Sequence, residues 1–474
     1  MSNNTEVCMT SDEIKNLDPP TMRRILTIAL PMVISQATDT VMLFADRLFL
    51  SKLGKTYIAA SMSGGLTNLV LMSLFLGIIG YVNAMVAQFY GGDKKEKCAS
   101  TVAQGVYLSF LSYPVLLLVL PLVMQFFKAA GHTPHQIGLE YSYLKILLLG
   151  SILGFLRTAL NSFFIGLGKT RIVMSANILA MVINVPLNYI FIFGKFGIPA
   201  MGIEGAAWGT VGGSFAAMIM ITAFYFGKRY RDEFGTHTNW RVNRELSLKL
   251  ARYGIPAGLE FFINIAAFNI FLQLIHSYSE DVAAAVTITF NWDLVSFIPM
   301  IGVGVATTTL VGQYVGAGDF DGARKAARLS YRIALAYASF MVFLFVTQSH
   351  ALVSVFTSGF TDVDGKVMNL SIVMLRLAAI YLLADATNLV FSGALRGAGD
   401  TRWVMVISGV LHWIMASGVY VLVKVVHASP IKTWLFFIGF ILTLGTCMVL
   451  RYRFGNWERF RIVEDERPGG EEGL

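Results

Sequence analysis

Long apolar stretches without charged residues alternate with short polar segments along the chain. Stretches such as 57–92, 98–127, 172–194, 205–227, 294–318 and 403–423 contain no Asp, Glu, Lys or Arg. A membrane-spanning helix needs about 20 mainly apolar residues, whereas buried helices of water-soluble proteins are usually shorter. The pattern therefore predicts an all-α integral membrane protein.

Further apolar stretches, most of them with a few charges, raise the number of predicted spans to about twelve. The spans cover residues 23–50, 57–90, 98–127, 141–165, 172–194, 205–227, 250–276, 283–314, 333–356, 370–395, 403–426 and 433–450. The composition agrees, because 55% of the 474 residues are hydrophobic and 14% are charged. Soluble domains have about 45–50% apolar and about 25% charged residues.

The positive charges favour one orientation in the membrane. With both termini on the cytoplasmic side, segments on that side hold most of the Lys and Arg residues, and the opposite segments hold few. By the positive-inside rule, we expect both termini in the cytoplasm and the protein in the cytoplasmic (inner) membrane. The net charge of +8 thus has a membrane explanation, and no nucleic-acid motif accompanies it. Cys8, Cys98 and Cys447 are too scattered for a disulfide framework or a zinc site.

An internal repeat divides the chain. The segment ILTIALPMVIS around Pro31 resembles LKLARYGIPAGLE around Pro256, and the same separation along the chain relates Gln88 in MVAQFYGG to Gln313 in LVGQYVGAGD. Further on, IGLGKTR (165–171) resembles RGAGDTR (396–402) at a slightly larger separation. Two copies of a six-helix unit share one orientation, since an even number of spans returns the chain to its starting side.

The repeat predicts two lobes with a cleft between them, as in secondary transporters that alternate access by rocking one half against the other. The predicted parts are a cytoplasmic tail (1–22), an N-lobe (23–227), a cytoplasmic linker (228–249), a C-lobe (250–453) and a second cytoplasmic tail (454–474).

Five acidic residues interrupt the apolar spans. They are Asp39, Asp46, Glu260, Asp293 and Asp385. A carboxylate at the bilayer centre costs about 2.5–3.5 kcal/mol on insertion scales, so it usually faces a bundle interior or a water-filled cavity. Such a group can exchange H⁺ or Na⁺ for a cationic substrate as the cavity opens to either side. These residues therefore predict cation-coupled antiport.

Structural alternatives stay open for several of these positions. Asp46 can pair locally with Arg47, and Glu260 or Asp385 can pair with Arg376 or Arg396. Asp293 can be a shallow residue in the outer half of its span. Asn184 and Asn188, one helical turn apart, can supply oxygens to a hard cation or simply hydrogen-bond between helices.

Several segments resemble one family over nearly the whole chain, from about Arg23 to Arg453. The segments are ADRLFLSKLG, MVAQFYGGDKK, GLGKTRIVMSANILAMVINVPLNYIFIFGKFG, GIPAGLE, LVGQYVGAGDFDGARKAAR and SGALRGAGDTR. They resemble the multidrug and toxic compound extrusion (MATE) transporters, in particular bacterial NorM- and DinF-like members. The resemblance implies twelve helices in two pseudo-symmetric six-helix lobes and export of organic, often cationic, compounds in exchange for Na⁺ or H⁺.

The resemblance also implies roles for individual residues. Asp46 matches the acid of the family's first helix, and Asp385 matches the tenth-helix acid of the NorM-type branch. The seventh helix departs from that branch, because Asn264 stands where its glutamate lies and Glu260 is one turn earlier. We expect Asp46, Glu260 and Asp385 to couple to the cation, with Na⁺ at Glu260 and Asp385. Asp39, Asp293, Asn184, Asn188 and Asn264 are candidate cleft residues.

These observations predict a monomeric antiporter rather than an enzyme. Its partners are expected to be small organic substrates and membrane lipids, with no cofactor beyond the coupling ion. A lipid-linked oligosaccharide flippase of the same superfamily is one alternative, although it needs a basic cleft for pyrophosphate. A narrow-specificity metabolite exporter and a channel are others.

Overall fold

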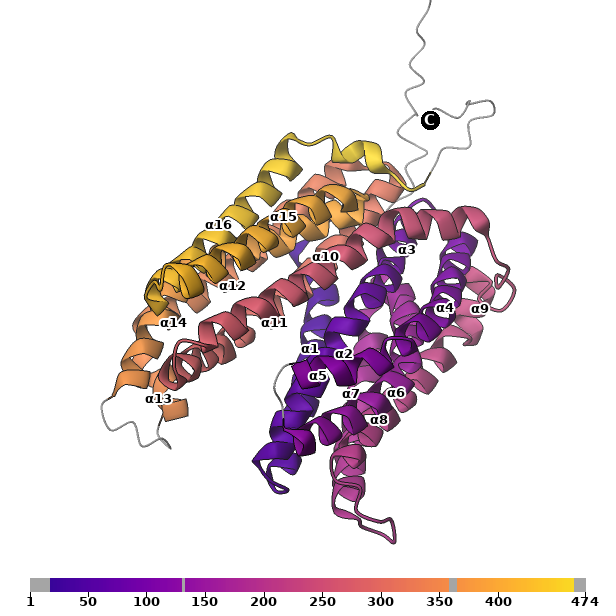
Figure 1. The fold of residues 1–474 in the computed structure, drawn as a ribbon. Coiled ribbons are helices and arrows are strands. Elements are labelled where there is room, and N and C mark those ends of the chain that lie inside the picture. Colours follow the sequence, from indigo (N-terminus) through magenta and orange to yellow (C-terminus); the bar gives the residue numbers. More distant parts are fainter. Residues whose placement is uncertain (1–17, 130–132, 358–364, 464–474) are drawn as a thin grey trace, which may run out of the picture.

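The computed structural model describes residues 18–129, 133–357 and 365–463, and these residues form helices and connecting turns without any strand (Figure 1). Residues 1–17 and 464–474, which include Cys8 and most of both predicted tails, lie outside the described residues. The prediction of an all-helical protein is confirmed.

The described residues up to Tyr225 form eight helices, α1 to α8. They are α1 (Met22–Ser51), α2 (Lys55–Gly80), α3 (Val82–Gly91), α4 (Lys95–Leu117), α5 (Leu120–Ala129), α6 (Pro134–Gly166), α7 (Thr170–Phe193) and α8 (Ile203–Tyr225). We call this half the N-lobe. Tyr81 alone separates α2 from α3, so the two form one nearly continuous span.

The second half repeats this arrangement after the short helix α9 (Lys228–Phe234). Its elements are α10 (Arg244–His276), α11 (Glu280–Ala317), α12 (Phe320–Thr347), α13 (Ser349–Thr357), α14 (Lys366–Ala398), α15 (Thr401–Tyr420), the π-helical turn η1 (Val421–Val425), α16 (Pro430–Phe454) and the 3₁₀ turn η2 (Trp457–Phe460). We call α10 to α16 the C-lobe. Because α10 begins at Arg244, it includes the last residues of the predicted linker.

Eleven helical segments of the described residues are long and apolar enough to cross a membrane. They match eleven of the twelve predicted spans. The remaining predicted span, 98–127, corresponds to α4 and α5. With 23 residues, α4 is long enough to cross about 30 Å of hydrocarbon. Its first residues, Lys95, Glu96 and Lys97, are charged and lower its apolar character.

Helix pairing repeats between the lobes. In the N-lobe α1 packs on α7, and in the C-lobe α10 packs on α15. Each of these first helices also reaches the other lobe, since α1 packs on α11 and α10 packs on α2. The two bundles lie side by side in Figure 1, with α10 and α11 running between them. This arrangement is the pseudo-two-fold relation that the repeat predicts.

The lobes are tied together at the end that carries both described chain ends. Gln88 of α3 donates from Nε2 to the carbonyl of Gly397 in α14 at 2.8 Å. Gln313 of α11 donates from Nε2 to the carbonyl of Gly166 in α6 at 2.8 Å. Each glutamine therefore binds a carbonyl in the last turn of a helix of the opposite lobe.

Close backbone approach accompanies these bonds. A Cβ at Gly91 would lie 1.8 Å from the carbonyl oxygen of Gln313, and one at Gly316 would lie 1.9 Å from that of Gln88. Only glycine fits at either position, because real Cβ atoms do not approach other atoms so closely. We call the contact formed by Gln88, Gly91, Gln313, Gly316 and the two helix ends the interlobe seal.

Candidate functional site

A buried polar group lies inside the N-lobe where α1, α7 and α8 meet. Asn188 donates from Nδ2 to the carboxylate of Asp46 and, at 3.2 Å, to Oδ1 of Asn184. Thr210 donates from Oγ1 to the second Asp46 oxygen at 3.3 Å. Asp46, Asn184 and Asn188 are 5%, 1% and 0% exposed. We call Asp46, Asn184, Asn188 and Thr210 the N-lobe polar group.

Local sequence explains how these side chains meet. Asn184 and Asn188 are one turn apart on α7 and therefore share a face. A Cβ at Gly209 of α8 would lie 1.8 Å from Oδ1 of Asn188, and one at Gly213 would lie 2.9 Å from Cβ of Asn184. The two glycines of α8 thus leave the room that both asparagines occupy.

One oxygen of this group lacks a partner. Oδ1 of Asn188 is buried and makes no hydrogen bond within the described part of the chain. An unpaired buried polar atom costs about 1–3 kcal/mol. The group therefore offers a carboxylate, amide oxygens and a hydroxyl oxygen, the ligand types that suit hard cations.

The other acid of α1 has different surroundings. Asp39, two turns before Asp46, is half-buried, and it interacts electrostatically with Arg157 of α6. Arg47 is exposed and forms no ion pair with Asp46 among the described residues. Asp46 therefore belongs to the lobe interior, and the alternative of a local pair with Arg47 is not the arrangement found.

A second acidic group lies inside the C-lobe. Tyr381 of α14 donates from its hydroxyl to Oδ1 of Asp293 in α11 at 3.0 Å. Asp385, one turn after Tyr381, is buried and close enough to Asp293 for the two carboxyl groups to interact electrostatically. We call Asp293, Tyr381 and Asp385 the C-lobe acidic group. Like charges at this range repel, so a bound cation would stabilise the group.

Glu260 lies apart from that group and is paired with a base. Arg396 of α14 donates from Nε to Oε2 of Glu260 at 3.0 Å and from Nη2 to Oε1 at 2.5 Å. Asn264 donates to Oε1 at 3.3 Å and accepts from Ser408 of α15 at 2.8 Å. Ser408 in turn contacts Nδ1 of His412 at 3.2 Å. The alternative of a buried pair with Arg396 is the arrangement found.

The predicted site residues therefore separate into three groups, with Asp39 outside them. Asn184 and Asn188 join Asp46, Asp293 joins Asp385, and Asn264 joins Glu260. Glu260 and Asp385, both expected to bind Na⁺, share no hydrogen bond or ion pair within the described residues. No cluster of three or more His, Cys, Asp or Glu side chains able to hold a metal ion occurs in residues 18–129, 133–357 and 365–463.

Two residues were missed at the sequence level. Thr210 is a lone hydroxyl in the small-residue stretch AAWGTVGG, which resembles ordinary helix packing. Tyr381 stands four residues before Asp385. Residues with this spacing share one face of a helix, so the sequence already indicated that Tyr381 lies near Asp385.

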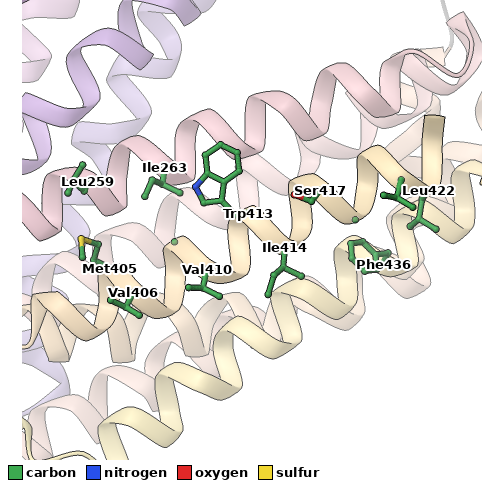
Figure 2. Close-up of a pocket in the computed structure, with 13 residues that line it drawn as sticks. Leu259, Ile263, Met405, Val406, Val410, Trp413, Ile414, Ser417, Leu422 and Phe436 are labelled. Atoms are coloured by element: carbon green, nitrogen blue, oxygen red, sulfur yellow. The ribbon is translucent and has the colours of Figure 1, made fainter. Parts of the chain in front are cut away.

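Two cavities stand out in the structure. The larger, about 1040 Å³, lies between α10, α15 and α16 and is lined by apolar side chains such as Ile263, Val410 and Trp413 (Figure 2). Ser417 contributes a hydroxyl to a lining that is otherwise nearly all apolar, so this cavity suits lipid chains rather than ions. The smaller, about 230 Å³, lies between the lobes and is lined by Glu260 and Arg396.

Comparison with known proteins gives a consistent family. A family model described as MatE matches residues 31–190 and 256–421, once in each repeat. The probable multidrug resistance protein NorM of Neisseria meningitidis serogroup B is 27% identical over 83% of this chain and 85% of its own length. The multidrug resistance protein PmpM of Pseudomonas aeruginosa is 28% identical over 83% of this chain and 82% of its length.

Solved structures share the fold. An outward-facing multidrug resistance MATE family transporter of the MOP superfamily superposes with a TM-score of 0.84 at 18% identity, covering 95% of this chain and 98% of that one. A MOP superfamily transporter from Pyrococcus furiosus, described as having a binding pocket of reverse polarity, gives a TM-score of 0.83 at 19% identity over 94% and 97% of the chains.

Proposed function

Because the chain belongs to the MatE family, we propose that it is a secondary active antiporter that exports organic, cationic or amphipathic compounds in exchange for Na⁺ or H⁺. The named relatives are multidrug resistance proteins, which supports export of varied compounds. We place the protein in the cytoplasmic membrane as a monomer with both termini in the cytoplasm. The interlobe seal then closes the cytoplasmic end, and the lobes open toward the outside.

We assign the coupling ion to the N-lobe polar group. The observation that carries this assignment is the buried amide of Asn188, whose Nδ2 donates to the carboxylate of Asp46 while its Oδ1 has no partner. A cation bound there would have the carboxylate as a ligand and would provide a partner for the unpaired amide oxygen. Without it, Asp46 keeps a buried charge that no Lys or Arg side chain of the described residues pairs with. The C-lobe acidic group, with Asp385, is the second candidate for H⁺ or Na⁺.

Coupling follows from the cost of the empty site. A buried carboxylate without a cation is unfavourable, so the protein favours the conformation in which the group regains water or an ion. Loading from outside allows the lobes to rock, and release to the cytoplasm restores the vacant group. A substrate that binds the protein without the coupling ion then moves outward. The ion and the substrate therefore cross the membrane in opposite directions.

Proteoliposomes test this proposal. Purified protein is expected to drive uphill ethidium export under an imposed Na⁺ gradient or an imposed pH gradient, and the effective gradient names the ion. Asp46→Asn should lower the initial rate by about tenfold or more, since hydrogen bonds to charged groups contribute about 1.5–3 kcal/mol. Asp321→Asn is the control, because its side chain is 93% exposed. Equal rates for Asp46→Asn and the control would contradict the ion assignment.

A further inference from the structure

The smaller cavity receives side chains from both lobes. Tyr81 and Asn83 line it from the N-lobe, and Glu260, Phe261, Val305 and Arg396 line it from the C-lobe. A cavity shared between the lobes changes shape when they move against each other. Its ligand is therefore coupled to the conformational change, which is the requirement for a transported substrate.

The cavity is lined by one ion pair, and the cation is its more exposed member. The Glu260 side chain is 4% exposed, and both of its oxygens accept hydrogen bonds from Arg396. The Arg396 side chain is 33% exposed. Of the two charged groups that line the cavity, the guanidinium is therefore the more accessible to an entering molecule.

Arg396 also has unused hydrogen-bonding capacity. Nε and Nη2 bind Glu260, and Nη1 makes no hydrogen bond within residues 18–129, 133–357 and 365–463. Guanidinium groups bind carboxylates strongly and with defined geometry. A carboxylate that accepts from Nη1 would leave the bond to Glu260 intact.

The remaining wall suits an apolar body. Phe261, Ile301, Val305 and Leu389 line the cavity with apolar side chains. We propose that the interlobe cavity binds the carboxylate of an amphipathic organic anion or zwitterion through Arg396, next to this apolar wall. The inference deepens the proposed transport function and rests on it.

A polar network positions the arginine. Asn264 donates to Glu260, and Ser408 donates to Asn264, so these side chains hold the carboxylate that orients Arg396. Asn264 and Ser408 are therefore positioning residues. The network ends at His412, which is buried against the ring of Phe440.

The proposal separates the substrate from the coupling ion. The N-lobe polar group lies on α1, α7 and α8, none of which lines the interlobe cavity. A cation would have to displace Arg396 to reach Glu260, at the cost of a buried ion pair. The two ligands therefore occupy different sites and communicate through lobe movement.

Three probes that share one fluorophore test the charge preference. They are dansylglycine, which carries a carboxylate, dansylglycinamide, which is neutral, and dansylcadaverine, which is a cation. Binding to the full-length protein in detergent is read from dansyl fluorescence. We expect the acid to bind about tenfold more tightly than the amide, as one charge-assisted hydrogen bond allows. Equal affinities, or a preference for the cation, would overturn the proposal without any variant.

A double variant without a change in net charge tests whether the preference for the acid over the amide arises at the Glu260–Arg396 pair. Glu260→Gln with Arg396→Gln removes the pair without leaving one buried charge, and it should abolish the tenfold difference. Asp321→Asn with Arg324→Gln removes an exposed ion pair as the control and should retain the difference. Retention of the preference in the Glu260 and Arg396 variant would contradict the assignment.

The proposed function can fail separately. Gradient-driven ethidium export measures antiport, whereas dansylglycine binding measures this cavity at equilibrium. Absence of gradient-driven export of both ethidium and dansylglycine, together with the acid preference in binding, would overturn the transport proposal only. Ethidium export together with equal affinities would overturn the cavity assignment only.

Discussion

Asp46 of α1 and Phe271 of α10 stand at equivalent places in the two repeats, separated along the chain as Pro31 is from Pro256. Asp46 accepts hydrogen bonds from Asn188 and Thr210. Phe271 is fully buried and stacks on Phe437 with ring centroids 4.2 Å apart. The same place in the fold thus holds a polar group in one lobe and an aromatic core in the other.

The remaining members of the N-lobe polar group show the same replacement. When IGLGKTR is aligned with RGAGDTR, Met415 and Val419 stand where α7 has Asn184 and Asn188, and both are buried in the C-lobe core. Conversely, the same alignment places Gly154 where the C-lobe has Asp385. Asp46 and Asp385 therefore each stand at a place where the other lobe has no acid.

The interlobe seal shows the opposite behaviour. Gln88 and Gln313 are equivalent residues and make equivalent bonds to equivalent carbonyls, those of Gly397 and Gly166. The repeats therefore agree where the lobes must fit each other and differ at the buried polar groups that we propose as ion sites. Closure by a two-fold related contact requires both copies, whereas an ion site requires only one.

Phe271→Asp should have the largest effect on this comparison. It would place an unpaired carboxylate among Phe290, Trp434 and Phe437, which surround the native ring. We expect a loss of about 3–5 kcal/mol in stability and little folded protein. Thermal melting and size-exclusion chromatography in detergent measure this, with Phe271→Leu as the apolar control. A melting temperature equal to that of the wild type would mean that position 271 in the C-lobe tolerates a charge.

Gly91→Ala and Gly316→Ala should break the interlobe seal about equally. Each added Cβ meets a backbone carbonyl that cannot move independently of its helix. Overpacking of this kind costs about 1–3 kcal/mol, and we expect lower melting temperatures and strongly reduced ethidium export. Gly65→Ala and Gly439→Ala are matched controls, since a Cβ there meets nothing within 4 Å. A clear difference between the two seal variants would show that the seal is not symmetric.

Gln88→Leu and Gln313→Leu remove the hydrogen bonds of the seal without a backbone clash. Each variant loses the bond to a helix carbonyl and a second bond, from the backbone N–H of Ile462 to Gln88 and from Arg24 to Gln313. We expect a loss of about 1 kcal/mol for each bond, similar in the two variants. Melting temperatures in detergent give the comparison. An effect confined to one variant would assign closure to one lobe.

Thr210→Val removes a hydroxyl from the N-lobe polar group, and Tyr381→Phe removes one from the C-lobe acidic group, so the two variants compare these groups. We expect the cation concentration for half-maximal ethidium export to rise up to about tenfold for Thr210→Val, because a hydrogen bond to a charged group is lost. For Tyr381→Phe we expect less than about threefold, since the unpaired amide oxygen lies in the N-lobe. The reverse order would move ion coupling to Asp385.

The amino-acid sequence alone predicts the helices, the repeat and the family. Charge-free runs of about 20 residues are decisive for spans because a bilayer excludes charge, and eleven of the predicted spans match described helices that can cross a membrane. The equal separation of Pro31 from Pro256 and of Gln88 from Gln313 identifies the duplication, and the MatE model matches once in each copy. Asn184 and Asn188 were also candidates, because residues one turn apart share a helix face.

Partners between distant helices were decided only by the tertiary structure. Hydropathy does not specify the rotation and tilt of a helix, so it could not choose between Arg376 and Arg396 for Glu260. Arg376 binds Ser349 instead, and Arg396 reaches Glu260 across the C-lobe. Packing likewise brought Thr210 to Asp46 and separated Glu260 from Asp385. Span positions follow from transfer energies summed along the chain, whereas sites depend on side-chain directions that packing between helices determines.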